Sequence, residues 1–273
     1  MPKTKSIIAE LPRPETVDAA ALARSYSAGE CDLIVVLGPT ASGKTRYAVS
    51  LAREISAVLA VPCEILSADS RQVYRGMDIG TGKDLDEYGE IPYHLIDIRP
   101  AGDKYNVHSF QMDFIEAYGD IVRRGAVPIL CGGTGLYISA VTSGYDFSEK
   151  KPLSAEGEAF TVRPEGLPER PFFIGTLVSR EVRNERIDRR LDARLQEGMV
   201  EEIKGLLDSG VPAETLIAYG LEYKFVTLYV LGELSYEQMR QSLATAIHQF
   251  AKRQMTWFRG IERSGNRIHW VEV

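Results

Sequence analysis

The stretch Leu33-Ile-Val-Val-Leu37, followed directly by Gly38-Pro-Thr-Ala-Ser-Gly43-Lys44-Thr45, decides the fold of this chain. The five apolar residues predict a buried parallel strand, and the helical spacing over 44–57 predicts a helix. The residues from Gly38 to Thr45 match G-x-x-x-x-G-K-[ST] without a mismatch, in the strand–loop–helix context that the motif requires. The stretch therefore predicts a phosphate-binding loop (P-loop).

The residue types of this loop suit phosphate binding. Its glycines let successive backbone N–H groups converge on phosphate oxygens, and the following helix adds its positive end. The Lys44 ammonium group can reach the terminal phosphate, and the Thr45 hydroxyl can bind Mg²⁺. We therefore expect the following residues to bind phosphate groups: Gly38, Thr40, Ala41, Ser42, Gly43, Lys44 and Thr45.

Further apolar runs extend this unit into a larger fold. Strands are predicted at 64–67, 94–97, 127–131 and 172–177, and a helix at 107–124. Strands that alternate with helices predict an α/β fold of the P-loop NTPase type, with a mostly parallel sheet flanked by helices. Two long helices, expected over 180–210 and 235–258, predict a helical C-terminal part. Ser235 and Gln238 form a capping box for the second helix.

Four segments follow from this pattern. Residues 1–31 are expected to form an N-terminal extension, a solvated arm with a short helix over 15–27. Residues 32–146 form the P-loop core. Residues 147–170 lack apolar periodicity and read as a short linker, and residues 171–273 return to the core and add the C-terminal helices.

The composition limits the possible classes of protein. The 273 residues are 44% hydrophobic and 26% charged, which excludes collagen-like and wholly disordered chains. The net charge of −6 means that any RNA contact needs a local basic patch. No run of about 18 apolar residues exists, so we expect no membrane contact. Three scattered cysteines argue against disulfides and a zinc site, and we therefore expect a cytoplasmic protein. For the oligomeric state, a monomer is the default expectation.

Polar side chains follow the predicted strand at 64–67. Asp69 comes directly after it, where a carboxylate faces the cleft and can act as a general base; the alternative is a helix cap or an Asx turn. Ser70, Arg71 and Gln72 add donors and acceptors of the kind that recognise the edge of a base.

A second glycine-rich turn, Gly132-Gly133-Thr134-Gly135, follows the predicted strand at 127–131. A P-loop nucleotidase usually has a metal-directing aspartate at this place. Asp97 is the only weak substitute. Two glycine-rich turns that face each other favour a diphosphate-bearing substrate over ATP hydrolysis.

These motifs resemble those of the tRNA dimethylallyltransferases. The matching stretches are Gly38–Thr45, Asp69–Thr81, Tyr93–Asp97, Gly132–Tyr137, Gly232–Tyr236 and Ala251–Trp257. They span most of residues 33–146 and 171–270. The resemblance implies transfer of a dimethylallyl group from dimethylallyl diphosphate to N6 of an adenosine beside the tRNA anticodon, with Mg²⁺.

The resemblance also implies residue roles. Asp69 corresponds to the general base, Thr134 to a contact of the leaving diphosphate, and Lys44, Thr45 and Arg180 to phosphate partners. Gly132 and Gly133 are expected to bind phosphate on a different ground, because their glycine-rich turn offers a second backbone cradle. The following residues fall in motifs that face the RNA: Asp69, Ser70, Arg71, Gln72, Tyr223, Lys224, Lys252, Arg253 and Gln254.

Two basic groups of residues are candidate RNA surfaces. The C-terminal basic patch comprises Lys252, Arg253, Arg259, Arg263 and Arg267, with Trp257 and Phe258 interleaved. The arginine stripe comprises Arg183, Arg186, Arg190 and Arg194, which share one helix face. The alternative is that acidic residues of the same helix pair with these arginines, and that Trp257 and Phe258 belong to the core.

The chain departs from the family where RNA is held. The family carries a long helical insertion where residues 147–170 stand, and a Gly-Tyr-Arg/Lys motif that reads Glu222-Tyr223-Lys224 here. Three alternatives to tRNA prenylation therefore remain. The same transfer could use free AMP, ADP or ATP as acceptor, the protein could be a small-molecule P-loop kinase, or it could be an inactive RNA-binding paralogue.

Overall fold

In a computed structural model of the protein, residues 12–144 and 164–273 are described. Most of the predicted linker at 147–170 lies outside the described residues. No helix of the described ranges is both long and apolar enough to cross a membrane.

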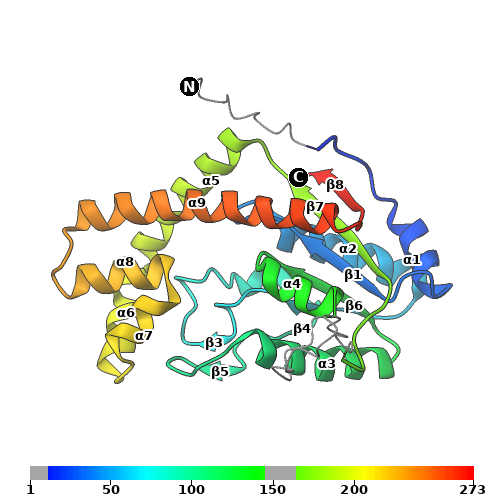
Figure 1. The fold of residues 1–273 in the computed structure, drawn as a ribbon, viewed down its shortest axis with the longest axis horizontal. Coiled ribbons are helices and arrows are strands. Elements are labelled where there is room, and N and C mark those ends of the chain that lie inside the picture. The colour runs from blue at the N-terminus through cyan, green and yellow to red at the C-terminus, as the bar shows by residue number, and fades with distance from the viewer. Residues whose placement is uncertain (1–11, 145–163) are drawn as a thin grey trace, which may run out of the picture.

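Six parallel strands form the main sheet, which confirms the predicted fold class. They are β1 (Leu33–Leu37), β2 (Cys63–Ser67), β4 (Tyr93–His94), β6 (Val127–Gly132), β7 (Pro171–Leu177) and β8 (Ile268–Glu272). Their order is β4-β2-β6-β1-β7-β8, and each neighbouring pair is parallel. β8 was not predicted; it brings the C-terminal end of the described chain back to the sheet, beside β7 (Figure 1).

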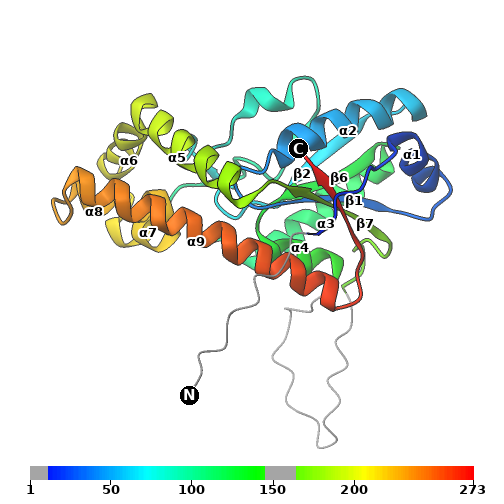
Figure 2. The same ribbon diagram turned by 90° about the horizontal axis from the view of Figure 1, so that it is seen from above.

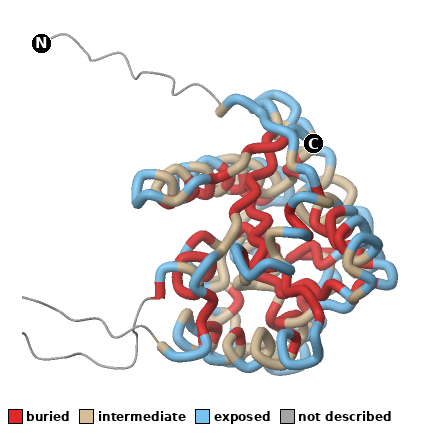
Figure 3. The backbone as a smooth tube through the Cα atoms, turned by 90° about the vertical axis from the view of Figure 1, so that its right-hand side faces the viewer, coloured by how far each residue is buried: buried red, intermediate tan, exposed pale blue. Residues whose placement is uncertain are grey.

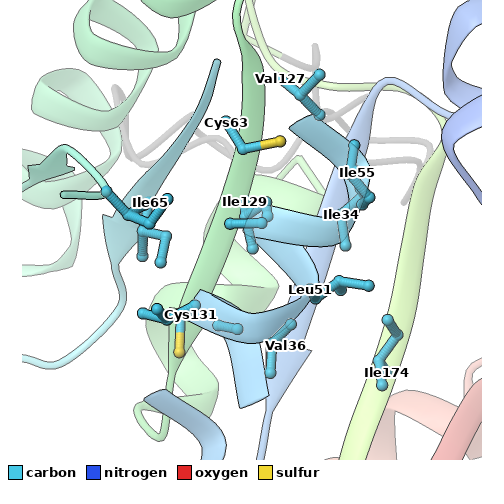
Figure 4. Close-up of a cluster of buried hydrophobic side chains, with 14 of the residues drawn as sticks. Ile34, Val36, Leu51, Ile55, Cys63, Ile65, Val127, Ile129, Cys131 and Ile174 are labelled. Atoms are coloured by element: carbon cyan, nitrogen blue, oxygen red, sulfur yellow. The ribbon is translucent and has the colours of Figure 1, made fainter. Parts of the chain in front are cut away.

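Alternation along β1 divides the core into two layers. Ile34 and Val36 face one side, where they pack with α1 (Ala19–Ser27) and α2 (Lys44–Leu59) in the cluster of Figure 4. Leu33, Val35 and Leu37 face the other side. That side is covered by α3 (Val107–Arg123), α4 (Gly135–Thr142) and the last turns of α9 (Tyr236–Arg263). Most of the buried residues lie in the interior of the molecule, between these layers (Figure 3).

The helical part has a third core. Its helices are α5 (Arg180–Glu197), α6 (Met199–Asp208), α7 (Ala213–Tyr219), α8 (Leu221–Val230) and the first half of α9. A two-stranded ribbon of β3 (Tyr74–Arg75) and β5 (Arg99–Pro100) packs beside them, and the 3₁₀ helix η1 (Leu85–Tyr88) lies between these two strands in the chain. α9 begins with the predicted capping box and runs from this helical part to the sheet, so it belongs to both (Figures 1 and 2).

Three local predictions were wrong for identifiable reasons. The helix expected over 180–210 is two helices, because Gly198 adopts φ +105° between them. The strand expected over 94–97 ends at His94, because Leu95 and Asp97 both have positive φ. The N-terminal extension does contain the short helix expected within 15–27, as α1, but it is no solvated arm, because α1 buries Leu22 and Ala23 in the core.

The buried carboxylate of Glu64 in β2 gives a test of the fold. It accepts hydrogen bonds from Arg124 Nη2 (2.7 Å) and pairs with His94 Nε2 (2.6 Å). Burial raises the pKa of Glu64, but its bonds with Arg124 and His94 outweigh this and leave the pKa lowered. We expect Glu64→Gln to reduce the free energy of unfolding at pH 7 by about 2 kcal/mol, measured by urea denaturation.

The pH dependence has a defined sign. Because the folded-state pKa of Glu64 lies below the unfolded value, its contribution is present above the unfolded pKa and is lost as pH falls through the folded pKa. The difference between wild type and Glu64→Gln should therefore shrink in acid. Glu116→Gln, at an exposed position of α3, is the control. A difference that stays constant from pH 7 into acid would contradict this assignment.

Candidate functional site

Three neighbouring strands bring three loops to the same edge of the sheet. β6 lies between β1 and β2, and Leu37 is in register with Gly132 while Ser67 is in register with Cys131. Because parallel strands end at the same edge, the P-loop after β1, the glycine turn after β6 and the Asp69 loop after β2 meet there. The sheet alone therefore places the predicted motifs together.

A polar cleft opens between these loops and the helical part. The P-loop contributes Thr40, Ala41, Gly43, Lys44 and Thr45; the Asp69 loop contributes Asp69, Arg71 and Gln72; and β6 ends in the cleft with Cys131 and Gly132. The helical part contributes Arg190, Arg194, Glu222, Phe250 and Gln254, and the loop after β3 contributes Thr81, Gly82, Lys83 and Asp84. The structure thus brings most of the predicted P-loop residues into one cleft with Asp69, Arg71 and Gln72, whereas Ser70 and Thr134 do not line it.

Close packing against β7 shapes the P-loop. The Ser42 and Thr176 hydroxyls lie 2.7 Å apart, and Ser42 is fully buried. A Cβ at Gly38 would lie 2.0 Å from Thr176 Oγ1, so only glycine fits there. Gly38 and Ser42 therefore shape the loop and do not line the cleft, unlike the other predicted P-loop residues.

Lys44 and Asp69 both line the cleft, one from the P-loop and one from the loop after β2. Burial lowers the pKa of Lys44, and the charge of Asp69 opposes that shift. The Asp69 carboxylate accepts a hydrogen bond from Arg71 N (3.1 Å). Asp69 thus makes an Asx turn and also lines the cleft, so the two readings of this residue are compatible.

Thr134 links the second glycine turn to the Asp69 loop. Its hydroxyl accepts a hydrogen bond from Ser70 N (3.1 Å). The Thr134 amide donates to Ala68 O (3.0 Å), so it is held by the residue that directly follows β2. Gly132 lines the cleft but Gly133 does not. The turn is therefore braced against its neighbours, and it is less of an open phosphate cradle than the sequence predicted.

Gln254 of α9 joins the two glycine-rich loops. It accepts a hydrogen bond from Thr40 N (2.8 Å) and donates one to Gly133 O (2.9 Å). Its side chain is buried, with 6% of the residue exposed. Gln254 was predicted to contact RNA; its burial assigns it to positioning the P-loop instead. No local pattern signals this contact, because the partners are 214 positions apart.

Of the residues predicted to face the RNA, some line the cleft and others do not. Arg71 forms an ion pair with buried Glu222 and lies over the Phe250 ring, with its guanidinium carbon 5.9 Å from the centroid. Tyr223 is fully buried and bonds to Glu202, which rules out the predicted RNA contact. Lys224 is exposed but does not line the cleft. Sequence reasoning missed Phe250 and the pairing role of Glu222.

Arg180, the α5 residue predicted to contact phosphate, lies outside the cleft, and Arg190 and Arg194 of the same helix line it instead. Arg180 is exposed in the first turn and does not line the cleft. Arg190 and Arg194, which were assigned to an RNA-binding stripe, turn into the cleft and form ion pairs with Asp84. The helical phase explains the difference, because residues 190 and 194 are one turn apart on the face that meets the P-loop.

Only part of the C-terminal basic patch is exposed to solvent and free to contact RNA. Lys252 and Arg253 are exposed, and the Arg253 guanidinium also lies over Phe250 (5.9 Å). Arg267 pairs with Glu15. Phe258 is buried as the core alternative expected, whereas Trp257 is 43% exposed and donates to Ser139 Oγ (3.0 Å).

No group of three or more acidic, histidine or cysteine side chains suited to a metal occurs in the ranges 12–144 and 164–273. Asp97 pairs with Lys83 and does not line the cleft, so it is no substitute for a metal-directing aspartate. Thr45 does line the cleft. This donor set fits Mg²⁺ only as an ion held jointly with substrate phosphates, which is its usual mode of binding in phosphate sites.

The fold and the site define a P-loop α/β protein with a polar cleft at the P-loop. The model of the IPP transferase family matches residues 72–166 and 148–261. The chain belongs to this family.

Curated relatives agree with the family assignment. The chain is 51% identical to tRNA dimethylallyltransferase 2 of Porphyromonas gingivalis, covering 88% of this chain and 94% of the relative. It is 47% identical to tRNA dimethylallyltransferase 1 of Parabacteroides distasonis over 89% and 92% of the two chains. The first alignment spans 289 positions, more than the 273 residues here, so that relative has residues without a counterpart in this chain.

A solved structure also resembles this fold. It is the tRNA isopentenylpyrophosphate transferase of Bacillus halodurans, with a TM-score of 0.75, 30% identity and coverage of 88% and 89% of the two chains.

Gln254 provides a test of the site's architecture. Gln254→Leu leaves Thr40 N and Gly133 O without this partner, so we expect a loss of about 2 kcal/mol in unfolding free energy and weaker pyrophosphate binding. Urea denaturation and calorimetry measure the two effects. Gln249→Leu, exposed on the same helix, should change neither. Wild-type values for Gln254→Leu would contradict the positioning role.

Proposed function

We propose that this protein transfers a dimethylallyl group from dimethylallyl diphosphate to N6 of an adenosine next to a tRNA anticodon. The observation that carries the proposal is the placement of Asp69 in one cleft with the P-loop residues Lys44 and Thr45. A base beside a phosphate site is what this transfer requires. The names of the relatives at 51% and 47% identity support the same reaction.

The reaction divides between the two sides of the cleft. The bond between the allylic carbon and the diphosphate oxygen breaks, and N6 of the adenine forms a bond to that carbon. Asp69 takes the proton from N6. Negative charge develops on the leaving diphosphate, where the P-loop amides and Lys44 stabilise it.

Mg²⁺ is proposed as the metal, held by the Thr45 hydroxyl together with the diphosphate oxygens. When bound, it adds positive charge beside the leaving group. Thr134 is proposed to contact the diphosphate from the second glycine turn, next to Ser70.

The acceptor is proposed to be a nucleotide within tRNA, not free AMP. Exposed Lys252 and Arg253 continue from Phe250 at the cleft, which supplies cations for an RNA backbone. An adenine inside a folded RNA must leave its stack to reach Asp69. Because tRNA is the substrate, we expect the enzyme to act in the cytoplasm.

One competition experiment tests this function. The protein is incubated with dimethylallyl diphosphate, Mg²⁺, unmodified tRNA and AMP, and both acceptors are analysed by mass spectrometry. We expect a prenylated adenosine in the tRNA and unchanged AMP. Prenylated AMP alone would transfer the chemistry to the free nucleotide. If neither product forms, the kinase and the inactive-paralogue alternatives take its place, and ATP consumption separates those two.

Asp69 has its own test. We expect Asp69→Asn to lower the single-turnover rate by about 100-fold or more, because the base is lost. The amide oxygen can still accept the bond from Arg71 N, so pyrophosphate affinity should stay within about twofold. Asp103→Asn, exposed and outside the cleft, is the control. An unchanged rate would remove Asp69 from the mechanism.

A further inference from the structure

Glu202 of α6 holds a loop that lines the cleft, although Glu202 itself does not line it. The β3 loop (residues 76–84) follows β3 in the chain. Glu202 Oε2 accepts hydrogen bonds from Asp78 N (2.8 Å) and Ile79 N (2.7 Å), and Glu202 Oε1 accepts one from Gly80 N (3.1 Å). Successive backbone N–H groups that converge in this way form an anion site, and here the anion belongs to the chain itself.

Tyr223 of α8 adds a fourth hydrogen bond to this carboxylate. Its hydroxyl donates to Glu202 Oε1 (2.7 Å), and the residue is fully buried. A Cβ at Gly80 would lie 2.8 Å from Tyr223 Oη, so the tyrosine ring lies against the loop backbone where only glycine fits. Hydrogen bonds to a charged acceptor are stronger than those between neutral groups. α6 and α8 therefore hold the β3 loop firmly at one point.

The opposite side of the β3 loop forms a wall of the cleft. Four of its residues line the cleft, namely Thr81, Gly82, Lys83 and Asp84. Gly82 O also accepts a hydrogen bond from Gln72 Nε2 (3.3 Å), which joins this wall to the Asp69 loop. No residue of α6 lines the cleft. Any influence of Glu202 on the cleft therefore passes through the β3 loop.

Two arginines of the cleft lie against this wall. Asp84 forms ion pairs with Arg190 and Arg194. A Cβ at Gly82 would overlap the Arg194 guanidinium group, so the loop backbone packs directly against it. Arg190 and Arg194 line the cleft together with Lys44 of the P-loop. A displacement of the β3 loop would therefore move these positive charges relative to the P-loop.

We infer that Glu202 is a positioning residue: it sets the place of the β3 loop and thereby the affinity of the cleft for an anion. This inference rests on the proposed function for its ligand, the diphosphate of the prenyl donor. Glu202 acts from outside the cleft, because its carboxylate is occupied by the three loop amides and the Tyr223 hydroxyl.

Calorimetry with inorganic pyrophosphate and Mg²⁺ tests this inference on the full chain. Glu202→Gln leaves one acceptor oxygen and turns an NH₂ group toward backbone N–H donors, so part of the loop's support is lost. We expect Kd to rise at least about fivefold, because small displacements of binding groups weaken a preorganised site. Glu201→Gln, exposed one residue earlier on α6, should stay within about twofold of wild type.

The stoichiometry of the same titration separates positioning from stability. Partial unfolding reduces the number of binding sites per chain and leaves the Kd of the remaining sites unchanged, whereas a displaced loop changes Kd itself. Tyr223→Phe is the second variant, in case Glu202→Gln does not fold. It keeps the ring against Gly80 and removes one of the four hydrogen bonds, so we expect a smaller rise in Kd.

Hydrogen–deuterium exchange tests the loop without any ligand. The amides of residues 78–80 should exchange at least about tenfold faster in Glu202→Gln than in wild type, and at the wild-type rate in Glu201→Gln. Unchanged exchange would overturn the inference.

The titration has two further decisive outcomes. An unchanged Kd in both Glu202→Gln and Tyr223→Phe, with or without faster exchange, would overturn the inference and leave the proposed function intact. Wild-type protein that binds no pyrophosphate would refute the proposed function, and with it the ligand named here, while the exchange rates would still decide whether Glu202 holds the loop.

Discussion

The parallel pairing of β1 with β6, and of β6 with β2, is the constraint on which the site depends. Because the three strands end at the same level, their following loops have no other place to go than one shared edge. The P-loop, the glycine turn and Asp69 are thus brought together by the sheet, whatever contacts their side chains make. The packing of Gly38 against Thr176 and the bond between Ser70 and Thr134 then fix the loops to within hydrogen-bond distance.

α9 connects this edge to the helical part. Its last turns pack on the sheet and its first half packs with α5 and α8, while Gln254 in between holds the P-loop. The cleft therefore has one wall made of strand ends and another made of helices. The P-loop and the Asp69 loop lie on the first wall, and the arginines of α5 and the ring of Phe250 lie on the second. A change in the packing of α9 would therefore displace residues on both walls of the cleft.

The sequence predicts those features whose signature lies in neighbouring residues of the chain. The P-loop, the apolar strands and the capping box of Ser235 have local signatures, and the structure contains them, apart from the strand expected over 94–97, which ends at His94. The contacts of Gln254, the pairing of Asp84 with α5 and the bonds of Glu202 to the amides of residues 78–80 join distant segments, so no local pattern predicts them. Arg180 was assigned by its place in a motif, whereas the direction of each side chain along α5 decides which arginine meets the cleft.

The central claim is that one diphosphate lies between the P-loop and the base. A crystal structure of the protein with a thio-diphosphate analogue of the donor, which resists transfer, tests this most directly. The account predicts both phosphates against the P-loop amides and Lys44, with the allylic carbon directed toward Asp69. Diphosphate bound elsewhere on the molecule, or an allylic carbon directed away from Asp69, would contradict it.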